Sequence, residues 1–352
     1  MIKIKENTTN KVLYYDFLRT FACFLVIVNH TVSFIFLSTK PSPTWYLSIT
    51  YFFVSKAAVP IFVMLSGALL LRKDYTYKQL FSKKILRIIL TIIVFSFTYQ
   101  FIFVENFNLF NPIVFLGKII KEPVTIPYWY LYMLLGLYIM TPMIRKMIKN
   151  FNYKDFIYFN VVFIIFSGIY PLVTLYFPTI QYSRFFTIPI FSTYIGYFIL
   201  GYFIDNIKIP QKKYKKAMII LSVLFIFSLA IQVILTSREY YSHGQVILKL
   251  DNVGLATIMS LAIPMFFLFK HIFSNIVFSD RIQSILSSIS SATFGIYLLH
   301  NMLIIRLDNV ASFLNNNLNW LLACLVFQLL IFIACFIITK ILQKIPLIKK
   351  LL

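Results

Sequence analysis

Long apolar runs recur along the whole chain and are separated by short polar segments. Each run is long enough to cross the hydrocarbon core of a bilayer, which takes about 20 residues of helix. The pattern therefore predicts an all-α integral membrane protein with about ten transmembrane helices, in which residues 1–352 form a single transmembrane domain. The expected helices cover 14–37, 46–71, 85–104, 128–144, 156–176, 185–205, 216–236, 252–273, 288–308 and 319–341.

Three short segments of this pattern have more specific interpretations. The first apolar run is expected to stay in the protein as a helix, because no small-residue cleavage site of a secretory signal follows it. The segment from Asn106 to Pro127 is the longest connection, and its Phe- and Ile-rich middle favours a short helix at the membrane interface. Ser66 and Gly67, near the end of the second run, favour close helix packing.

The composition of the 352 residues supports the membrane interpretation. Hydrophobic residues make up 60 % of the chain and charged residues 12 %, whereas soluble domains carry about 25 % charged residues. The formal net charge of +22 would suggest a nucleic-acid partner in a soluble protein. Here the basic residues lie in the connections between spans, so we expect them to contact anionic membrane lipids, and we expect no nucleic acid as partner.

The distribution of Lys and Arg over these connections predicts the orientation in the membrane. Alternate connections, beginning with the N-terminal segment, hold 24 basic residues, and the opposite connections hold 7. Because basic residues concentrate on the cytoplasmic side, this ratio predicts both termini in the cytoplasm. Trp45, Trp129 and Trp320 fall at the expected outer starts of helices, where an aromatic belt is typical.

The first expected helix carries three ionisable residues, Asp16, Arg19 and His30. Ionisable residues inside spans are rare and usually functional. Asp16 and Arg19 are three residues apart and can pair on one helix face. Arg19 and His30 are separated by about three turns, so they project in nearly the same direction, about 16 Å apart along the axis. An elongated substrate can then contact both.

Each of these residues also has an interpretation without chemistry. Arg19 can extend to the cytoplasmic headgroups with Asp16 as its partner, and His30 can form an interhelical hydrogen bond. Lys56, the other basic residue inside a span, can extend to the outer surface. The cysteines are interpreted as small core residues, and no spacing of His and Cys residues predicts a metal site. No functional role is assigned to Cys23, Cys324, Cys335, His243 and His271.

Five short sequence blocks follow one another between residues 16 and 300. They are Asp16-x-x-Arg19 with His30, Pro60-Ile-Phe-Val-Met-Leu-Ser66-Gly67 with Lys56 four residues earlier, Lys83-Lys84-Ile-Leu-Arg87, Trp129-Tyr-Leu-Tyr132 with Gly136-Leu-Tyr138, and Phe294-Gly-Ile-Tyr297-Leu-Leu-His300. Together they resemble the membrane acyltransferase 3 family, which modifies bacterial surface polysaccharides and related acceptors. The stretch from Trp129 to Gly136 lacks the acid that many members have there, which resembles the shorter subgroup without an attached soluble domain.

The resemblance implies a multi-pass O-acyltransferase of the bacterial cytoplasmic membrane. It would move an acyl group, acetyl by default, from cytoplasmic acyl-coenzyme A to a hydroxyl of a cell-envelope glycan or lipid-linked precursor. Acyl-coenzyme A is then a substrate, and no bound cofactor is expected. His30 is the expected base or nucleophile, with Arg19 and Asp16 as further catalytic residues. The expected substrate-binding residues are Lys56, which is also a candidate oxyanion stabiliser, Arg87, Trp129, Tyr297 and His300.

Two other functional classes share the apolar pattern. A polysaccharide exporter or lipid-linked glycan flippase would need more polar groups within its spans, because a large glycan path must be hydrated. The polar groups expected within these spans are few, and those of Lys56, His30 and His300 are expected at one depth. A membrane sensor would need a cytoplasmic domain to carry a signal, and the sequence predicts none. The acyltransferase interpretation is therefore favoured.

Overall fold

The structure is a computed structural model that describes residues 13–31, 37, 40–103, 111–180, 192–207, 210–276 and 278–352. The described residues form α-helices, short 3₁₀ and π-helical turns and connections, with no β-strand among them. Eight helical segments in this part of the chain are long and apolar enough to cross a membrane. Two shorter helices complete the bundle: α1 (Leu13–Asn29) and, within the described residues, α11 (Thr193–Asn206).

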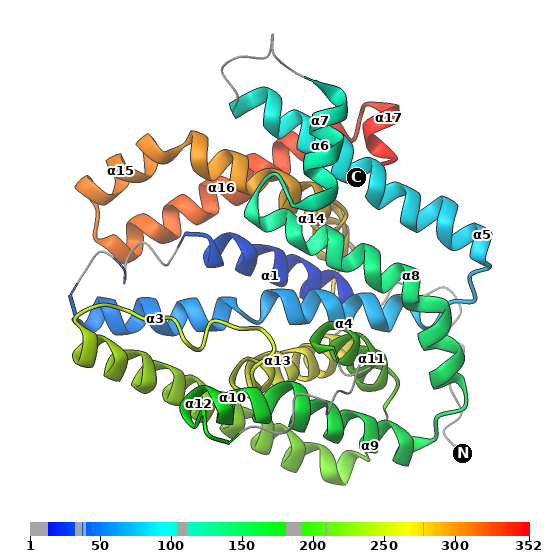
Figure 1. Cartoon of the computed structure of the whole chain (residues 1–352), viewed down its shortest axis with the longest axis vertical. Helices are drawn as coiled ribbons and strands as arrows, with labels where there is room; N and C mark the ends of the chain where they lie inside the picture. Colours follow the sequence, from blue (N-terminus) through cyan, green and yellow to red (C-terminus); the bar gives the residue numbers. More distant parts are fainter. Residues whose placement is uncertain are drawn as a thin grey trace.

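The helices follow the expected order along the chain (Figure 1). Besides α1 and α11, the spans are α3 and α4 (Pro43–Ser55, Ala58–Leu70); α5, η1 and α6 (Tyr77–Leu80, Phe81–Ile85, Leu86–Phe103); η3 and α8 (Ile126–Tyr128, Trp129–Lys149); α9, η4 and α10 (Tyr153–Phe163, Ile164–Ile169, Tyr170–Tyr176); α12 (Gln211–His243); α13 (Ala256–Asn275); α14 (Asp280–Arg306); and α16 (Trp320–Leu342). Within the described ranges, three short helices lie between or after the spans: α7 (Pro112–Lys121), α15 (Asp308–Asn317) and α17 (Pro346–Lys349).

This architecture confirms the all-α membrane fold with about ten spans, and differs from the expected boundaries at several ends. Helix α7 confirms the short helix expected within 106–127. Helix α12 extends beyond the expected 216–236 at both ends, and α14 begins before the expected residue 288, because hydropathy detects the apolar part of a helix and misses its polar turns. Helix α15 was not expected from the apolar pattern. Residues 185–191 of the expected sixth span lie outside the described residues.

The first helix ends at Asn29, which is earlier than the expected residue 37. Polar side chains follow one another there, and the Thr31 hydroxyl donates to the carbonyl of Ile27 at 2.8 Å. Such local side-chain bonds compete with the continuation of a helix. The His30 amide still donates to the carbonyls of Val26 and Ile27, so His30 keeps its position at the end of the last turn. Residues 32–36 and 38–39 lie outside the described residues.

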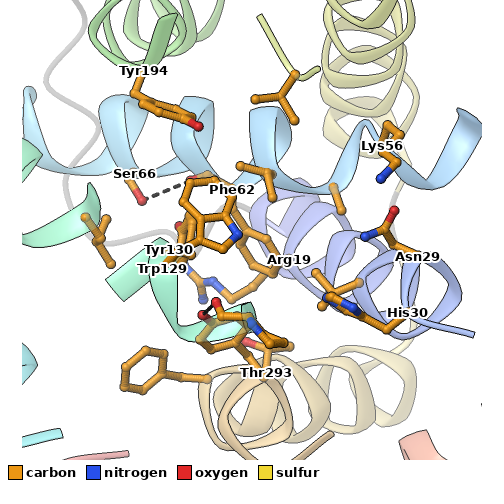
Figure 2. A pocket seen from close by; sticks show the side chains of 18 of the residues that line it. Arg19, Asn29, His30, Lys56, Phe62, Ser66, Trp129, Tyr130, Tyr194 and Thr293 are labelled. Carbon is orange, nitrogen blue, oxygen red and sulfur yellow. Dashed lines mark hydrogen bonds between the residues drawn. The ribbon is translucent and has the colours of Figure 1, made fainter. Parts of the chain in front are cut away.

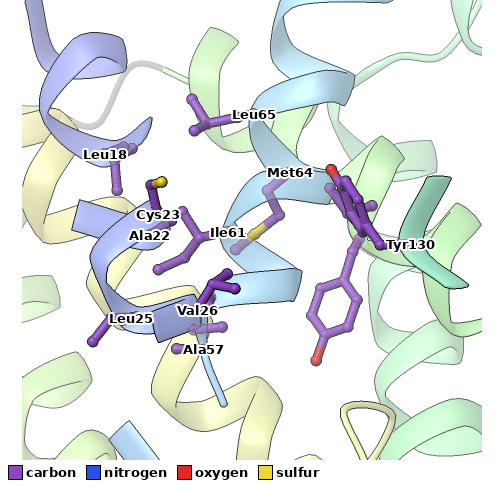
Figure 3. Close-up of a cluster of buried hydrophobic side chains, with 14 of the residues drawn as sticks. Leu18, Ala22, Cys23, Leu25, Val26, Ala57, Ile61, Met64, Leu65 and Tyr130 are labelled. Carbon is purple, nitrogen blue, oxygen red and sulfur yellow. The ribbon is translucent and has the colours of Figure 1, made fainter. Parts of the chain in front are cut away.

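Helix α1 lies inside the bundle and packs against α3, α4, α13, α14 and α16. Figure 3 shows one side of this packing, where Ala22 and Val26 of α1 lie near Ala57 and Ile61 of the second span. Apolar residues along the whole of α1 are buried. Polar side chains of this helix are therefore enclosed by protein, and lipid does not surround them.

The second span is broken between α3 and α4, at Lys56 and Ala57. Pro60 explains the break, because a proline has no N–H for the carbonyl four residues earlier and its ring crowds that carbonyl. The carbonyl in question is that of Lys56. The amide of Lys56 keeps its bonds to the carbonyls of Phe52 and Phe53. The break thus places Lys56 at the end of one helical segment in the middle of the span.

Helices α4 and α11 pack against each other at two glycines, Gly67 and Gly201. A Cβ atom built on Gly67 would overlap the carbonyl oxygen of Phe198, and one on Gly201 would overlap the carbonyl oxygen of Met64. Small residues at such crossings let helix backbones approach closely. The expectation of close packing at Gly67 is therefore confirmed.

Polar contacts join the ends of four spans that the distribution of basic residues assigns to the cytoplasmic side. Asp205, near the end of α11, accepts hydrogen bonds from Tyr14, Tyr15 and Arg72. The ammonium group of Lys270, on α13, donates to the carbonyls of residues 204, 205 and 207 at 2.6, 2.8 and 3.2 Å. The ends of α1, α4, α11 and α13 thus meet at one end of the bundle.

An ion pair joins two further cytoplasmic-side segments near the same end. Arg145, in the last turns of α8, lies 2.5 Å from a carboxylate oxygen of Asp74, in the connection after α4. The hydrogen bond from Arg145 lowers the pKa of the exposed Asp74 carboxyl. Residues of the basic set therefore gather at the end of the bundle to which the charge distribution assigns them.

Replacing Gly67 with alanine should destabilise the protein, because the added methyl group has no space beside the α11 backbone. Overpacking of this kind costs roughly 1–3 kcal/mol, sometimes more. We expect a lower thermal unfolding midpoint in detergent for Gly67→Ala and for Gly201→Ala. Gly136→Ala is the matched control, since nothing lies within 4 Å of a Cβ at that position. An unchanged midpoint for both interface variants would contradict the close packing.

Cysteine labelling can test the orientation, because the native Cys23, Cys324 and Cys335 are buried. Lys78 and Asn316 are both exposed, at opposite ends of the bundle by chain order. A membrane-impermeant maleimide should label Asn316→Cys in intact cells, and Lys78→Cys only after the membrane is permeabilised. Labelling of Lys78→Cys from outside in intact cells would show that the predicted orientation is wrong.

Candidate functional site

A cavity of about 850 Å³ lies within the bundle and brings together residues from most of the spans. Of the eight residues that the sequence singles out, six line it: Arg19, His30, Lys56, Arg87, Trp129 and Tyr297. Figure 2 shows Arg19 in the middle of this view, with His30 and Lys56 at one end. Asp16 and His300 do not line the cavity, and each lies behind a residue that does.

The guanidinium group of Arg19 is held by two neighbours. Its Nη1 atom lies 3.8 Å from a carboxylate oxygen of Asp16 and donates to the hydroxyl of Ser290, on α14, at 3.1 Å. The Ser290 hydroxyl in turn donates to Asp16 at 2.6 Å. Asp16 is buried, whereas the Arg19 side chain is a third exposed to the cavity. The predicted Asp16–Arg19 pair is therefore present, and Ser290 is a third member that spacing within one helix did not reveal.

Two further cations line the cavity near Arg19, from the start of the third span. Arg87 donates to the carbonyl of Leu351 at 3.0 Å and to an oxygen of Leu352 at 2.7 Å. Lys84 lies in the π-helical turn η1 and also lines the cavity. The guanidinium of Arg87 also lies 5.3 Å from the ring centre of Phe294. This end of the cavity therefore has three basic side chains, of which Arg19 is paired with Asp16, at the depth where the predicted cytoplasmic leaflet lies.

His30 lines the other end of the cavity, and His300 lies directly behind it. The two ring centroids are 5.2 Å apart. His300 is fully buried, and its Nδ1 atom lies 2.5 Å from the carbonyl of Tyr297. Because a carbonyl only accepts hydrogen bonds, this contact fixes the proton of His300 on Nδ1. Its Nε2 atom has no hydrogen-bond partner among the described residues, and its ring packs against that of His30.

Lys56 lies at the same end of the cavity as His30 and has a partner that the sequence interpretation missed. Its ammonium nitrogen is 2.6 Å from a carboxylate oxygen of Asp251 and 4.3 Å from the ring centre of Phe52. The Lys56 side chain is only 11 % exposed, so it does not extend to the outer surface. The composition could have indicated Asp251. The chain has only 11 acidic residues among 352, so few carboxylates are available to pair with a buried lysine.

Aromatic side chains form the wall between the two ends. The ring centroids of Trp129 and Tyr194 are 5.7 Å apart, and those of Tyr130 and Tyr297 are 5.5 Å apart. The hydroxyl of Tyr297 donates to the carbonyl of Pro127, and that of Tyr128 donates to the carbonyl of Leu298 at 2.9 Å. These bonds attach η3, directly before α8, to α14, which fixes the aromatic wall against the helix that carries His300.

The arrangement combines a cationic end, an aromatic wall and an end with an imidazole. Cations bind phosphate groups through charge-assisted hydrogen bonds, and a neutral imidazole can accept a proton near pH 7. Among the described residues, no three His, Cys, Asp or Glu side chains are arranged to hold a metal ion. The cavity can therefore hold an anionic, elongated molecule with its far end beside a proton acceptor.

A family model described as an acyltransferase domain matches residues 12–340. The chain belongs to the acyltransferase 3 family. The match begins before α1 and ends in the last turn of α16, and with the apolar helices it identifies this acyltransferase as a multi-pass membrane protein. No curated protein and no solved structure gives a significant match to the chain. The roles of the individual site residues stay predictions, although the geometry brings them together around one cavity.

The contacts of Arg19 predict how conservative substitutions affect acyl transfer. Arg19→Lys keeps the charge but removes the planar group that can bond Ser290 and still face the cavity. Ser290→Ala removes the hydroxyl between Arg19 and Asp16, and the loss of a hydrogen bond to a charged group costs about 1.5–3 kcal/mol. We expect both variants to lower acyl transfer by roughly 10-fold to 100-fold, while membrane insertion is normal.

Ser288→Ala is the matched control for these variants, since Ser288 lies on the same helix and does not line the cavity. Its acyl transfer should equal that of the wild type. If Arg19→Lys and Ser290→Ala also transferred acyl groups at the wild-type rate, Arg19 would have no role beyond the structure of the helix pair.

Proposed function

We propose that this acyltransferase moves an acyl group, acetyl in the simplest case, from cytoplasmic acyl-coenzyme A to a hydroxyl of a cell-envelope glycan or lipid-linked precursor. The observation that supports it most is the continuous cavity with cations at one end and His30 at the other. On this proposal the protein works in the bacterial cytoplasmic membrane, with the donor entering from the cytoplasm and the acceptor from outside.

The cationic end suits the donor. Coenzyme A carries phosphate groups, for which Arg19, Lys84 and Arg87 supply positive charge. Its pantetheine arm is long and uncharged, as the aromatic part of the cavity requires. Arg19 and His30 are about 16 Å apart along α1. An extended arm anchored at the cations would therefore carry the thioester toward His30.

His30 would then act on the acceptor hydroxyl. As general base, it takes the hydroxyl proton while the oxygen bonds to the acyl carbon. The carbon–sulfur bond breaks, and the proton passes from His30 to the leaving thiolate, which yields an ester and free coenzyme A. As nucleophile, His30 would first carry the acyl group itself and then release it to the hydroxyl. Both routes need His30 unprotonated at the start, and the fully buried His300 adjoins it in either case.

Replacing His30 tests this mechanism directly. Loss of a general base typically lowers a rate by about 10²–10⁴-fold, so His30→Ala should abolish glycan acylation while the protein still reaches the membrane. His300→Ala should be milder, because His300 does not line the cavity. The measurement is the NMR ester signal of the envelope glycan in a deletion strain that expresses each variant.

His243→Ala is the control, since His243 lies at the exposed end of α12, outside the cavity. It should restore the ester signal as the wild type does. Near-normal acylation by His30→Ala would exclude the proposed mechanism. An ester signal that is the same with and without the gene would exclude glycan acylation and favour an export function.

A further inference from the structure

The connection between α12 and α13 enters the bundle and contributes directly to the cavity. Figure 1 shows residues 244–255 running from the end of α12 back toward α13. Leu250 and Leu255 are buried, and the hydroxyl of Tyr197 donates to the carbonyl of Val253 at 2.7 Å. These contacts hold Asp251 at the break in the second span, where it pairs with Lys56.

The Lys56–Asp251 pair has hydrogen-bonding capacity left over. Asp251 pairs with Lys56 through one carboxylate oxygen, and a carboxylate accepts about four hydrogen bonds in all. The Lys56 ammonium has three donors, of which Asp251 accounts for one. Both residues line the cavity, and the Asp251 side chain is 31 % exposed. Acceptors and donors therefore lie next to each other on one wall.

Two amides extend this polar wall. The Asn29 oxygen lies 3.4 Å from the hydroxyl of Ser55, which donates to the carbonyl of Phe52 at 2.6 Å, and the Asn252 oxygen accepts from the amide of Gly254 at 2.9 Å. Each side-chain amide also has an NH₂ group, which can donate to a ligand. Asn29 and Asn252 both line the cavity. Figure 2 shows Asn29 beside Lys56 and His30.

We propose that Lys56 and Asp251 bind the acceptor, and that this acceptor is an electrically neutral sugar ring with two adjacent hydroxyls. The inference rests on the proposed function and specifies its acceptor site. Each sugar hydroxyl is both donor and acceptor, so adjacent hydroxyls can bond to the carboxylate and the ammonium together. The Lys56–Asp251 pair has no net charge, so it suits an uncharged ring. An acidic sugar would place its negative charge against the carboxylate of Asp251.

The test is sugar binding without donor, in purified protein reconstituted in nanodiscs. Saturation-transfer difference NMR would be recorded with a mixture of neutral methyl hexopyranosides. We expect a signal from at least one sugar with the wild type and a loss of at least tenfold with Asp251→Asn. Glu122→Gln is the matched control, because Glu122 is exposed and does not line the cavity. It should bind as the wild type does.

A double variant separates sugar binding from a purely structural ion pair. Asp251→Asn leaves the buried Lys56 unpaired, so a folding defect alone could weaken binding. Lys56→Met with Asp251→Leu removes both charges, and replacing a buried pair by apolar residues is often neutral for stability. We expect the double variant to fold, by its size-exclusion profile, and to bind no sugar. Wild-type binding by the double variant would overturn the inference.

Acyl transfer from acetyl-coenzyme A to the bound sugar is measured in the same preparations. If the wild type transfers acetyl groups to the sugar, the KM of Asp251→Asn for sugar should be about tenfold higher than that of the wild type. Its KM for acetyl-coenzyme A should change less than twofold. Sugar binding without transfer would refute the proposed function and leave the acceptor site standing. Transfer by the wild type with equal sugar binding by Asp251→Asn would refute the acceptor site alone. Absence of binding by every sugar would also overturn it.

Discussion

Charge inside an apolar bundle needs a partner, and this constraint determines how the spans are arranged around the cavity. An unpaired charge in such surroundings costs several kcal/mol or more. Arg19, Lys56 and Arg87 accordingly each have an acid or carbonyl oxygens beside them. Arg19 has Asp16 and Ser290, and Lys56 has Asp251. Because Ser290 and Asp251 come from distant parts of the chain, satisfying these charges fixes α14 and the α12–α13 connection against α1 and the second span.

A single proline has a large effect on this arrangement. Pro60 interrupts the helical hydrogen bonds at Lys56, and the break lets the end of α3 and the start of α4 diverge from a regular helix. Downstream, the same span packs against α11 through Gly67. The block from Pro60 to Gly67 therefore has two local functions, which are to place Lys56 at a break and to bring two backbones into contact. Both follow from elementary residue properties.

Much of the fold and part of the site could be predicted from the sequence. The predictable features depend on one segment alone, and the others depend on contacts between segments. Span number and order follow from apolar length, which each segment carries by itself. The Arg19–His30 alignment follows from helical periodicity within one segment, and both residues line the cavity. Ser290 and Asp251 could not be assigned, because their roles depend on which segments become neighbours. The end of α1 at Asn29 was missed since side-chain bonds to the backbone leave no trace in hydropathy.

The separation between the cationic end and His30 has an electrical consequence. Moving one elementary charge across a membrane is worth about 2.3 kcal/mol per 100 mV. If the proposed function holds, the phosphates stay at Arg19 and Arg87, and only an uncharged acyl arm reaches across the roughly 16 Å to His30. The multiply charged coenzyme A then does not cross the electric field of the membrane, either before or after transfer. Turnover would therefore be indifferent to the membrane potential, so the enzyme would work equally well in energised and de-energised cells.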